Sequence, residues 1–310
     1  MNNSIRVFAP ATIGNIGIGF DVLGLCLEHP GDLITIRSSE RPGVRIQKIS
    51  GTTIPIPTDP QHNTASVAVI RLLEHLELNA VGFDIEIEKQ MPFGSGLGSS
   101  AASAVAAVVA ANELLGNPLS RRALLPFACD GEAVSTGGRV VDNVAPSLLG
   151  GIVLIRDIPS LDVMQLPVPK ALYAALVYPH IQILTADSRS KLQETVSLKD
   201  YIRQSANLAS FIHALHTSDF ELIRRCLHDI IVEPQRAPGI PHFYEVKKAA
   251  MEAGALACSI SGSGPTIFAL CGDAEIAERT AAEMAQVFQK NGIQNTPYCS
   301  EVNTLGATVR

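Results

Sequence analysis

The chain has 310 residues, a net charge of −6, 46% hydrophobic residues and no Trp. This length suffices for two domains, each with a core of its own. The acidic balance, with no basic stripe and few aromatic residues, argues against a nucleic-acid partner. No apolar run approaches the roughly 18 residues that a transmembrane helix needs. The first residues also lack the apolar segment of a signal peptide, so we expect no leader and no membrane association.

The six cysteines are scattered, without the paired spacing of a zinc site or a redox motif, and most lie in apolar segments. Buried thiols of this kind are typical of a reducing compartment, so we expect a cytoplasmic protein without disulfides. The eight histidines are equally dispersed, which argues against a transition-metal site.

In the first half of the chain, alternating or apolar segments predict strands, and helical periodicity or an Ala-rich composition predicts helices. The predicted elements are, in order, strands 5–8, 33–37 and 44–49, helix 63–76, strand 83–88, helices 101–115 and 121–132, and strand 151–155. A proline-rich loop is expected over 52–60, and a second loop over 134–146.

A polar connector punctuated by Pro159, Pro167 and Pro169 follows, and we take it as the boundary between domains of residues 1–160 and 161–310. The second half predicts strand 171–178, helices 198–216 and 220–228, a helix ending near 252, strands 256–260 and 266–270, helix 274–291 and a strand near 298–302. The order strand, helix, strand, strand, helix, strand is typical of a split βαβ sandwich.

The most informative segment is the glycine-rich run 92–103, which lies between a predicted strand and an Ala-rich predicted helix. Strand, glycine loop and helix start together leave unpaired backbone N–H groups at the positive end of a helix dipole, where a phosphate fits. The run lacks the lysine of a Walker A loop and the spacing of the dinucleotide fingerprint. Alternatively, its glycines merely permit the positive φ of a turn. Two serines at the helix start, Ser99 and Ser100, are suited to capping it or to holding a metal ion.

Two other segments are polar without the composition of an ordinary surface loop. Asn15 and Asp21 lie six residues apart beside glycines, although an ordinary turn would also explain them. Farther along, Glu132 precedes an Asp142-Asn143 pair set among apolar residues, and such a pair is costly to bury unless it is hydrogen-bonded. The alternative is an Asx turn that caps a short helix, in which neighbouring side chains diverge.

The segment 261–266 is rich in glycine and lies between two predicted strands, so it forms either a hairpin turn or a second backbone wall facing the phosphates. Two arginines complete the set. Taken alone, Arg189 and Arg236 would each be interpreted as a charged residue on the surface. Arg236, however, lies in a proline-stiffened loop and is suited to holding a carboxylate with two hydrogen bonds.

Together, and in this order, the segments 10–24, 92–103, 142–151 and 261–266 resemble the galactokinase–homoserine kinase–mevalonate kinase–phosphomevalonate kinase (GHMP) superfamily, and its homoserine kinases in particular. The resemblance covers nearly the whole chain. It implies an α+β, two-domain GHMP kinase fold, in which the N-terminal domain contains a left-handed βαβ unit, the C-terminal domain is a ferredoxin-like sandwich, and the active site lies between them. It also implies ATP-dependent phosphorylation of the side-chain hydroxyl of L-homoserine, a step of threonine biosynthesis, often by a homodimer.

The resemblance assigns roles to single residues. For ATP it implies Asn63, near the adenine, and Pro92, Phe93, Gly94, Ser95, Gly96, Leu97, Gly98, Ser99, Ser100, Ala101 and Ala102 at the phosphates. The interpretation of 261–266 as a second wall adds Gly262, Ser263 and Gly264. For Mg²⁺ the resemblance implies Glu132 with Ser99 or Ser100. For L-homoserine it implies Asp21 at the ammonium, Arg189 and Arg236 at the carboxylate, and Asn15 and Asn143 near the hydroxyl.

The chemistry of this assignment is consistent, because a zwitterionic amino acid needs one anion and one or two cations in fixed places. Phosphoryl transfer depends more on positioning and charge neutralisation than on a base. Relatives similar to mevalonate kinase and galactokinase have a carboxylate where this chain has Asn143, so we expect Asn143 and Asn15 to orient the hydroxyl without a side-chain base. The chain departs from the homoserine kinase pattern at Val140, where histidine is common, and at Gln193, where proline is frequent. Another GHMP kinase acting on a related hydroxy acid, and a non-catalytic nucleotide sensor, remain as alternatives.

Overall fold

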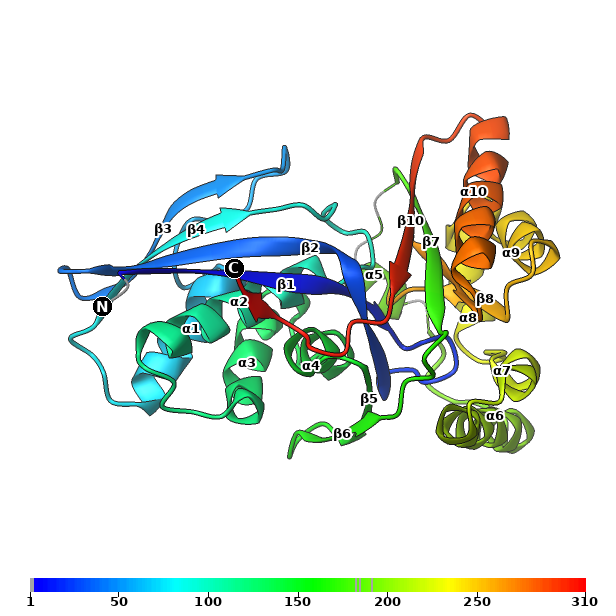
Figure 1. The fold of residues 1–310 in the computed structure, drawn as a ribbon, viewed down its shortest axis with the longest axis horizontal. Coiled ribbons are helices and arrows are strands. Elements are labelled where there is room, and N and C mark those ends of the chain that lie inside the picture. The colour runs from blue at the N-terminus through cyan, green and yellow to red at the C-terminus, as the bar shows by residue number, and fades with distance from the viewer. Residues whose placement is uncertain (1–2, 182, 184, 191) are drawn as a thin grey trace.

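Two β-sheets form the framework of the molecule, and helices pack against both (Figure 1). The computed structural model describes residues 3–181, 183, 185–190 and 192–310. The first sheet has the order β11-β1-β2-β4-β3, and β5 and β6 extend it beside β2. Its strands are β1 (Ser4–Gly14), β2 (Leu23–Ser39), β3 (Gly43–Ser50), β4 (Gly82–Glu88), β5 (Ile152–Asp157), β6 (Asp162–Leu166) and β11 (Thr308–Val309).

The alternating sequence of β4 shows why this sheet has one buried and one wet face. Phe83, Ile85 and Ile87 are buried under the helices, whereas the acidic residues between them face outward. The outward carboxylates pair with arginines of β3, β2 and β1, as Arg45–Asp84, Arg37–Glu86 and Arg6–Glu88. A period-two pattern of this kind fixes the register, because a slip by one residue would bury the carboxylates.

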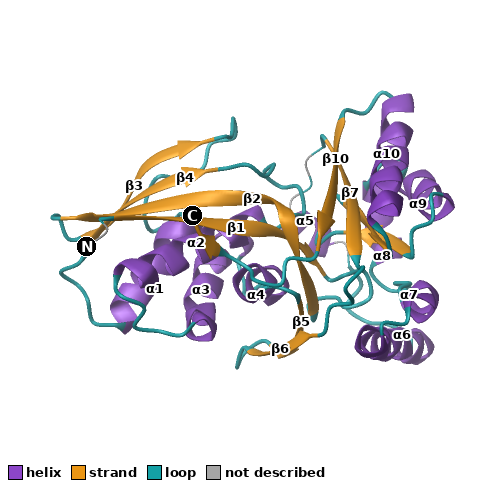
Figure 2. Ribbon diagram, viewed as in Figure 1, coloured by secondary structure: helices purple, strands orange, loops and turns teal. Residues whose placement is uncertain are grey.

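Four helices gather on one side of the first sheet (Figure 2): α1 (Thr64–His75), α2 (Ser99–Leu114), α3 (Leu125–Thr136) and α4 (Val141–Leu149), with a 3₁₀ turn at Arg121–Leu124. The central one, α2, packs on β1, β2 and the other three helices. Nearly all of its residues are buried, which explains why it is apolar on every side. The parallel strands β3 and β4 are joined through α1 and form a βαβ unit.

The second sheet consists of β7 (Tyr173–Pro179), β8 (Ala257–Ile260), β9 (Ile267–Cys271) and β10 (Asn295–Glu301) in the antiparallel order β10-β7-β9-β8. Two helices, α9 (Phe243–Glu252) and α10 (Ala274–Lys290), pack against it. The chain order β7, α9, β8, β9, α10, β10, with a spatial strand order of 4-1-3-2, is the ferredoxin-like arrangement that the sequence predicts.

Between β7 and α9 the chain inserts several helical segments. They are α5 (Thr185–Ser190), α6 (Leu198–Thr217), α7 (Phe220–Cys226), α8 (Glu233–Arg236) and a 3₁₀ turn at Ala237–Gly239. In Figure 1, α5 lies near the junction of the two sheets, α8 lies beside β8, and α6 and α7 lie below the second sheet and its helices.

The first sheet takes strands from both sides of residue 160, because β6 pairs with β5 and the terminal strand β11 pairs with β1. The domain boundary between residues 160 and 161 stays a prediction. Within the described part of the chain, no helix combines the length and apolarity needed to cross a membrane.

One segment differs from the sequence-based expectation. Residues 134–146 are predicted as a loop, but α4 begins at Val141 and contains Asp142, Asn143 and Pro146. Pro146 has no N–H to donate to the Asp142 carbonyl four residues earlier, and that carbonyl instead lies against Gly24, where an added Cβ would be 1.8 Å from the oxygen. Asp142 and Asn143 are therefore consecutive residues of a first helical turn, and their side chains contact each other.

Candidate active site

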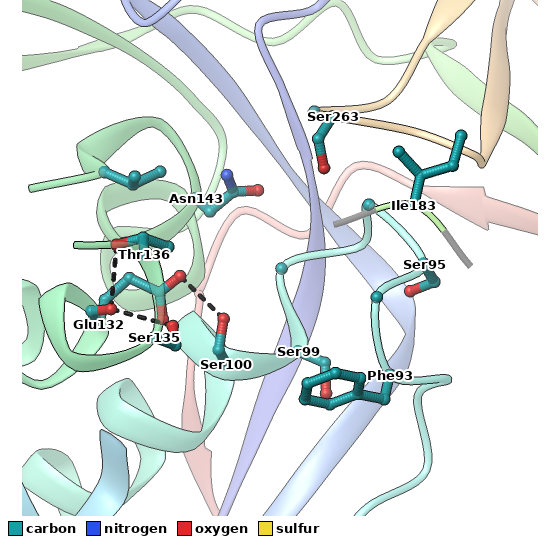
Figure 3. Close-up of a pocket in the computed structure, with 15 residues that line it drawn as sticks. Phe93, Ser95, Ser99, Ser100, Glu132, Ser135, Thr136, Asn143, Ile183 and Ser263 are labelled. Carbon is teal, nitrogen blue, oxygen red and sulfur yellow. Dashed lines mark hydrogen bonds between the residues drawn. The ribbon is translucent and has the colours of Figure 1, made fainter. Parts of the chain in front are cut away.

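The glycine loop turns sharply between β4 and α2 and lines a pocket of about 260 Å³ (Figure 3). Gly94, Gly96 and Gly98 have φ values of +65°, +81° and +71°, a region that side chains rarely adopt. Gly98 is the residue just before α2, and the hydroxyl of Ser100 and the side chain of Phe93 also border the pocket. The pocket thus contains the unpaired N–H groups and the positive dipole end of a buried sixteen-residue helix, an arrangement that favours an anion.

The turn at 261–266 connects β8 to β9 and also contacts the glycine loop. Ser261 Oγ donates to the Gly96 carbonyl at 2.7 Å, and the backbone N–H of Thr266 donates to the Ser95 carbonyl at 3.1 Å. A Cβ added to Gly96 would lie 2.5 Å from the Ser261 carbonyl oxygen. Gly262 and Ser263 line the same pocket, so the hairpin turn is also its second wall.

A buried ion pair supports the glycine loop from behind. Lys89 Nζ donates to Asp32, to the Ser99 carbonyl at 2.9 Å and to Ser103 Oγ at 2.8 Å. Asp32 also accepts hydrogen bonds from Ser99 Oγ at 2.8 Å and from two backbone N–H groups at the start of the loop. The hydroxyl of Ser99 is therefore bound within this network, whereas the hydroxyl of Ser100 lies beside the pocket.

Glu132 lies across from the start of α2, on helix α3 (Figure 3). Ser100 Oγ donates to Glu132 Oε1 at 2.8 Å. Within the described residues, Glu132 Oε2 is buried and accepts no hydrogen bond. Burial is the main reason that the pKa of Glu132 is raised to about 7; the hydrogen bond from Ser100 and the charge of Lys89 oppose this shift. A buried carboxylate oxygen without a donor is an available ligand for a hard cation.

The fit to Mg²⁺ rests on this unpartnered oxygen together with the Ser100 hydroxyl. No group of three His, Cys, Asp or Glu side chains capable of holding a metal occurs in the described parts of the chain. Mg²⁺ typically takes one or two protein ligands and completes its shell with water and phosphate oxygens. The donor set around Glu132 is therefore suited to an ion that arrives with a polyphosphate.

Asn143 faces the pocket from the first turn of α4 (Figure 3). Its Oδ1 accepts a hydrogen bond of 2.8 Å from Thr12 Oγ1, and its Nδ2 donates to Asp142 Oδ1 at 3.3 Å. Burial is the main cause that raises the pKa of Asp142 to about 7, and the nearby charge of Asp21 raises it further. Val140, which takes the place of a common histidine, also lines this pocket.

Asp21, Arg189 and Arg236 converge around one aromatic ring. Arg189 Nη2 lies 2.7 Å from Asp21 Oδ1. The guanidinium carbons of Arg189 and Arg236 lie 5.2 Å and 5.1 Å from the centre of the Phe20 ring, within the range of cation–π attraction. Arg236 is buried and donates from Nη1 to the Gly262 carbonyl at 2.7 Å. Burial, and next the charge of Arg189, lower the pKa of Arg236.

Asn15 braces this charged cluster. Its Nδ2 donates to the Gly262 carbonyl at 3.1 Å, and its Oδ1 accepts from the backbone N–H of Asp21 at 2.9 Å. The Gly262 carbonyl thus binds both Asn15 and Arg236, and Gly262 also borders the glycine-loop pocket. The charged cluster and the pocket are neighbours that share this turn.

Asn63 lies outside this arrangement. It caps α1, with Oδ1 accepting from the Ala65 N–H at 3.0 Å and Nδ2 donating to the Pro57 carbonyl at 2.8 Å. It is buried and does not line the pocket. A role for Asn63 at the adenine stays a prediction.

Comparison with known proteins identifies the family of this chain. Residues 63–151 match the GHMP kinases N terminal domain, and residues 211–290 match the GHMP kinases C terminal family. The homoserine kinase of Chlorobium phaeobacteroides (strain BS1) is 46% identical over 99% of each chain, and that of Chloroherpeton thalassium is 44% identical over 91% of this chain and 92% of the relative. The crystal structure of homoserine kinase from Cytophaga hutchinsonii matches with a TM-score of 0.98 and 47% identity, covering 100% of this chain and 98% of that one. The chain belongs to the homoserine kinase family of the GHMP kinases.

Membership in the homoserine kinase family confirms the two-domain fold and the resemblance that the motifs indicate. The structure brings the glycine loop, the 261–266 turn, Glu132 and Asn143 to one pocket, with Asp21, Arg189 and Arg236 beside it. The individual roles of these residues stay predictions. No sequence pattern indicates the groups that hold the site in place, namely Thr12, Phe20, Asp32 and Lys89. A charged residue after an alternating strand suggests a surface position, so only the contact with Asp32 in the folded structure shows that Lys89 is buried behind the glycine loop.

Proposed function

We propose that this protein transfers the γ-phosphate of ATP to the side-chain hydroxyl of L-homoserine, giving O-phospho-L-homoserine and ADP for threonine biosynthesis. The observation that carries this proposal is the cluster of Asp21, Arg189 and Arg236 next to the glycine-loop pocket. One carboxylate and two guanidinium groups match the ammonium and the carboxylate of an amino acid. The homoserine kinase names of its relatives, which match over nearly the whole chain, support the same reaction.

The glycine loop and the start of α2 would hold the triphosphate through backbone N–H groups, as the helix dipole favours. Glu132 and Ser100 would hold Mg²⁺, because the hydroxyl of Ser99 already donates a hydrogen bond to Asp32. When bound, Mg²⁺ supplies neutralisation of the charge that develops on the phosphate oxygens.

In the proposed reaction, the homoserine hydroxyl oxygen forms a bond to the γ-phosphorus while the bond from phosphorus to the oxygen of ADP breaks. The hydroxyl proton passes to the transferred phosphate or to water, because loose phosphoryl transfer needs no strong base. Asn143 lies at the pocket wall and is suited to orienting the hydroxyl. Asn15 supports the site by holding the backbone of Asp21 and the turn at Gly262.

A hydroxy acid without an ammonium group is a poorer match for this cluster. It would replace Asp21 as the partner of Arg189 and leave the Asp21 carboxylate without a cation. A site that leaves a charged group unpaired rejects such an analogue strongly. The alternative kinase substrate is therefore not favoured.

The test compares L-homoserine with 4-hydroxybutyrate, which keeps the hydroxyl and the carboxylate but lacks the ammonium, in an assay of ADP release. We expect kcat/KM to be about 100-fold or more higher for L-homoserine. Arg236→Ala should lower kcat/KM for L-homoserine by a similar factor, whereas the exposed Arg156→Ala should leave it unchanged. Equal use of both substrates by the wild-type protein would contradict the proposal, and so would full activity of Arg236→Ala.

Two further expectations accompany this proposal. The free state of all six cysteines supports a reducing compartment such as the cytoplasm. A homodimer is expected in solution, and sedimentation equilibrium would test it.

A further inference from the structure

The side-chain amide of Asn143 has two hydrogen-bonded neighbours, and their chemistry determines which of its ends faces each of them. Asp142 Oδ1 lies 3.3 Å from Nδ2, and Thr12 Oγ1 lies 2.8 Å from Oδ1. A hydroxyl both donates and accepts, so Thr12 alone would permit either orientation. The ionised form of Asp142 only accepts, so in that form a flipped amide would place Oδ1 against Asp142 Oδ1 with no proton between them. The Thr12 hydroxyl must then donate to Oδ1.

Thr12 also connects Asn143 to the glycine loop. It is fully buried near the end of β1, and its backbone N–H donates to the Leu97 carbonyl at 3.0 Å. A Cβ added to Gly98 would lie 2.3 Å from Thr12 Oγ1 and 3.0 Å from Asn143 Oδ1. The amide oxygen of Asn143 therefore lies against the last glycine of the loop, on the side where α2 begins.

We infer that Thr12 is a positioning residue for phosphoryl transfer, which holds the amide oxygen of Asn143 toward the phosphate loop so that it accepts the O–H of the attacking alcohol. An alcohol that donates its proton to Oδ1 keeps its oxygen lone pairs free to face phosphorus. This inference rests on the proposed function, because it concerns the orientation of the substrate hydroxyl. Thr12 itself acts only through Asn143 and touches no reacting atom.

The decisive variants are Thr12→Val, which keeps the shape and removes the hydroxyl, and Thr12→Ser, which keeps the hydroxyl. Thr12→Val should lower kcat for L-homoserine by about ten- to a hundredfold, as the loss of an oriented group does, while the KM for ATP changes little. Thr12→Ser should recover most of this loss. Thr280→Val is the matched control, since Thr280 is equally buried but lies in α10 of the second domain.

A double-mutant cycle separates positioning from a general structural role. In an Asn143→Ala background, Thr12→Val should have no further effect on kcat, because the group through which it acts is gone. Calorimetric titration with Mg·ATP measures the fraction of competent protein in each variant, so a folding defect is corrected for. Wild-type kcat in Thr12→Val, or an equal loss in both backgrounds, would overturn the inference. A wild-type protein that does not phosphorylate L-homoserine would instead overturn the proposed function, so the two failures are distinct.

Discussion

Replacing Lys89 with Met tests whether the glycine loop depends on the buried ion pair behind it. Asp32 is fully buried and accepts hydrogen bonds from Lys89, from Ser99 and from two backbone N–H groups. Lys89→Met removes the ammonium but leaves the carboxylate in place with three uncharged donors. Removing one partner of such a pair typically costs about 3–5 kcal/mol, because the remaining charge stays out of water. For a protein with a total stability of about 5–15 kcal/mol this is a large loss.

The control is Arg37→Met, which breaks the pair with Glu86 on the outer face of the same sheet. Both of these side chains are about half exposed, so the loss should be below about 1 kcal/mol. Urea denaturation followed by circular dichroism gives both free energies of unfolding. The double variant Asp32→Asn with Lys89→Met should recover part of the loss, since it leaves no buried charge. Equal losses for Lys89→Met and Arg37→Met would refute the reasoning, as would strict additivity of the two changes in the double variant.

Three other perturbations have defined outcomes. Gly98→Ala should abolish phosphotransfer, because its Cβ would overlap a buried hydroxyl at positive φ, whereas Gly292→Ala, at a similar φ in open space, should cost only about 1 kcal/mol in a thermal melt. Compared with the free energy of unfolding of Asp142→Asn, that of the wild-type protein should fall as the pH rises from about 4 to about 7. The reason is that the Asp142 carboxyl binds its proton more tightly in the folded state than in the unfolded chain. A pH series of urea titrations checks the sign. Ser100→Ala should raise the Mg²⁺ concentration needed for half-maximal activity more than Ser99→Ala does, as steady-state kinetics would show.

Features encoded locally could be predicted from the sequence. The alternation of β4, the glycine loop and the apolar α2 each depend on neighbouring residues, and the structure places all three where the pattern indicates. The strand and helix order of the second half likewise predicts its ferredoxin-like topology. In the site, the family resemblance implies a common ligand for Asp21, Arg189 and Arg236, and the structure brings them together around Phe20.

Features that depend on distant contacts could not be predicted. Asp32 follows a Pro-Gly pair that suggests a turn, yet it lies inside the long strand β2, where Lys89 compensates its charge from 57 residues away. Thr12 lies in an apolar strand, and no local pattern indicates that its hydroxyl meets Asn143. The prediction of a loop over 134–146 is wrong for the same reason. Helix α4 is stabilised by its packing against β1, β2 and α2, which the local sequence does not reveal.

Several glycines of the four motifs share a feature that no single motif reveals. An added Cβ on Gly14 would lie 2.6 Å from Asp142 Oδ2, and one on Gly24 would lie 1.8 Å from the Asp142 carbonyl oxygen. Gly96 approaches the 261–266 turn in the same way, and Gly98 approaches β1 and α4. Each of these glycines is needed because another motif packs directly on its Cα, so the motifs constrain one another's composition. A substitution in one motif should therefore displace the functional groups of another, and this mutual packing explains physically why the four segments occur together in one chain.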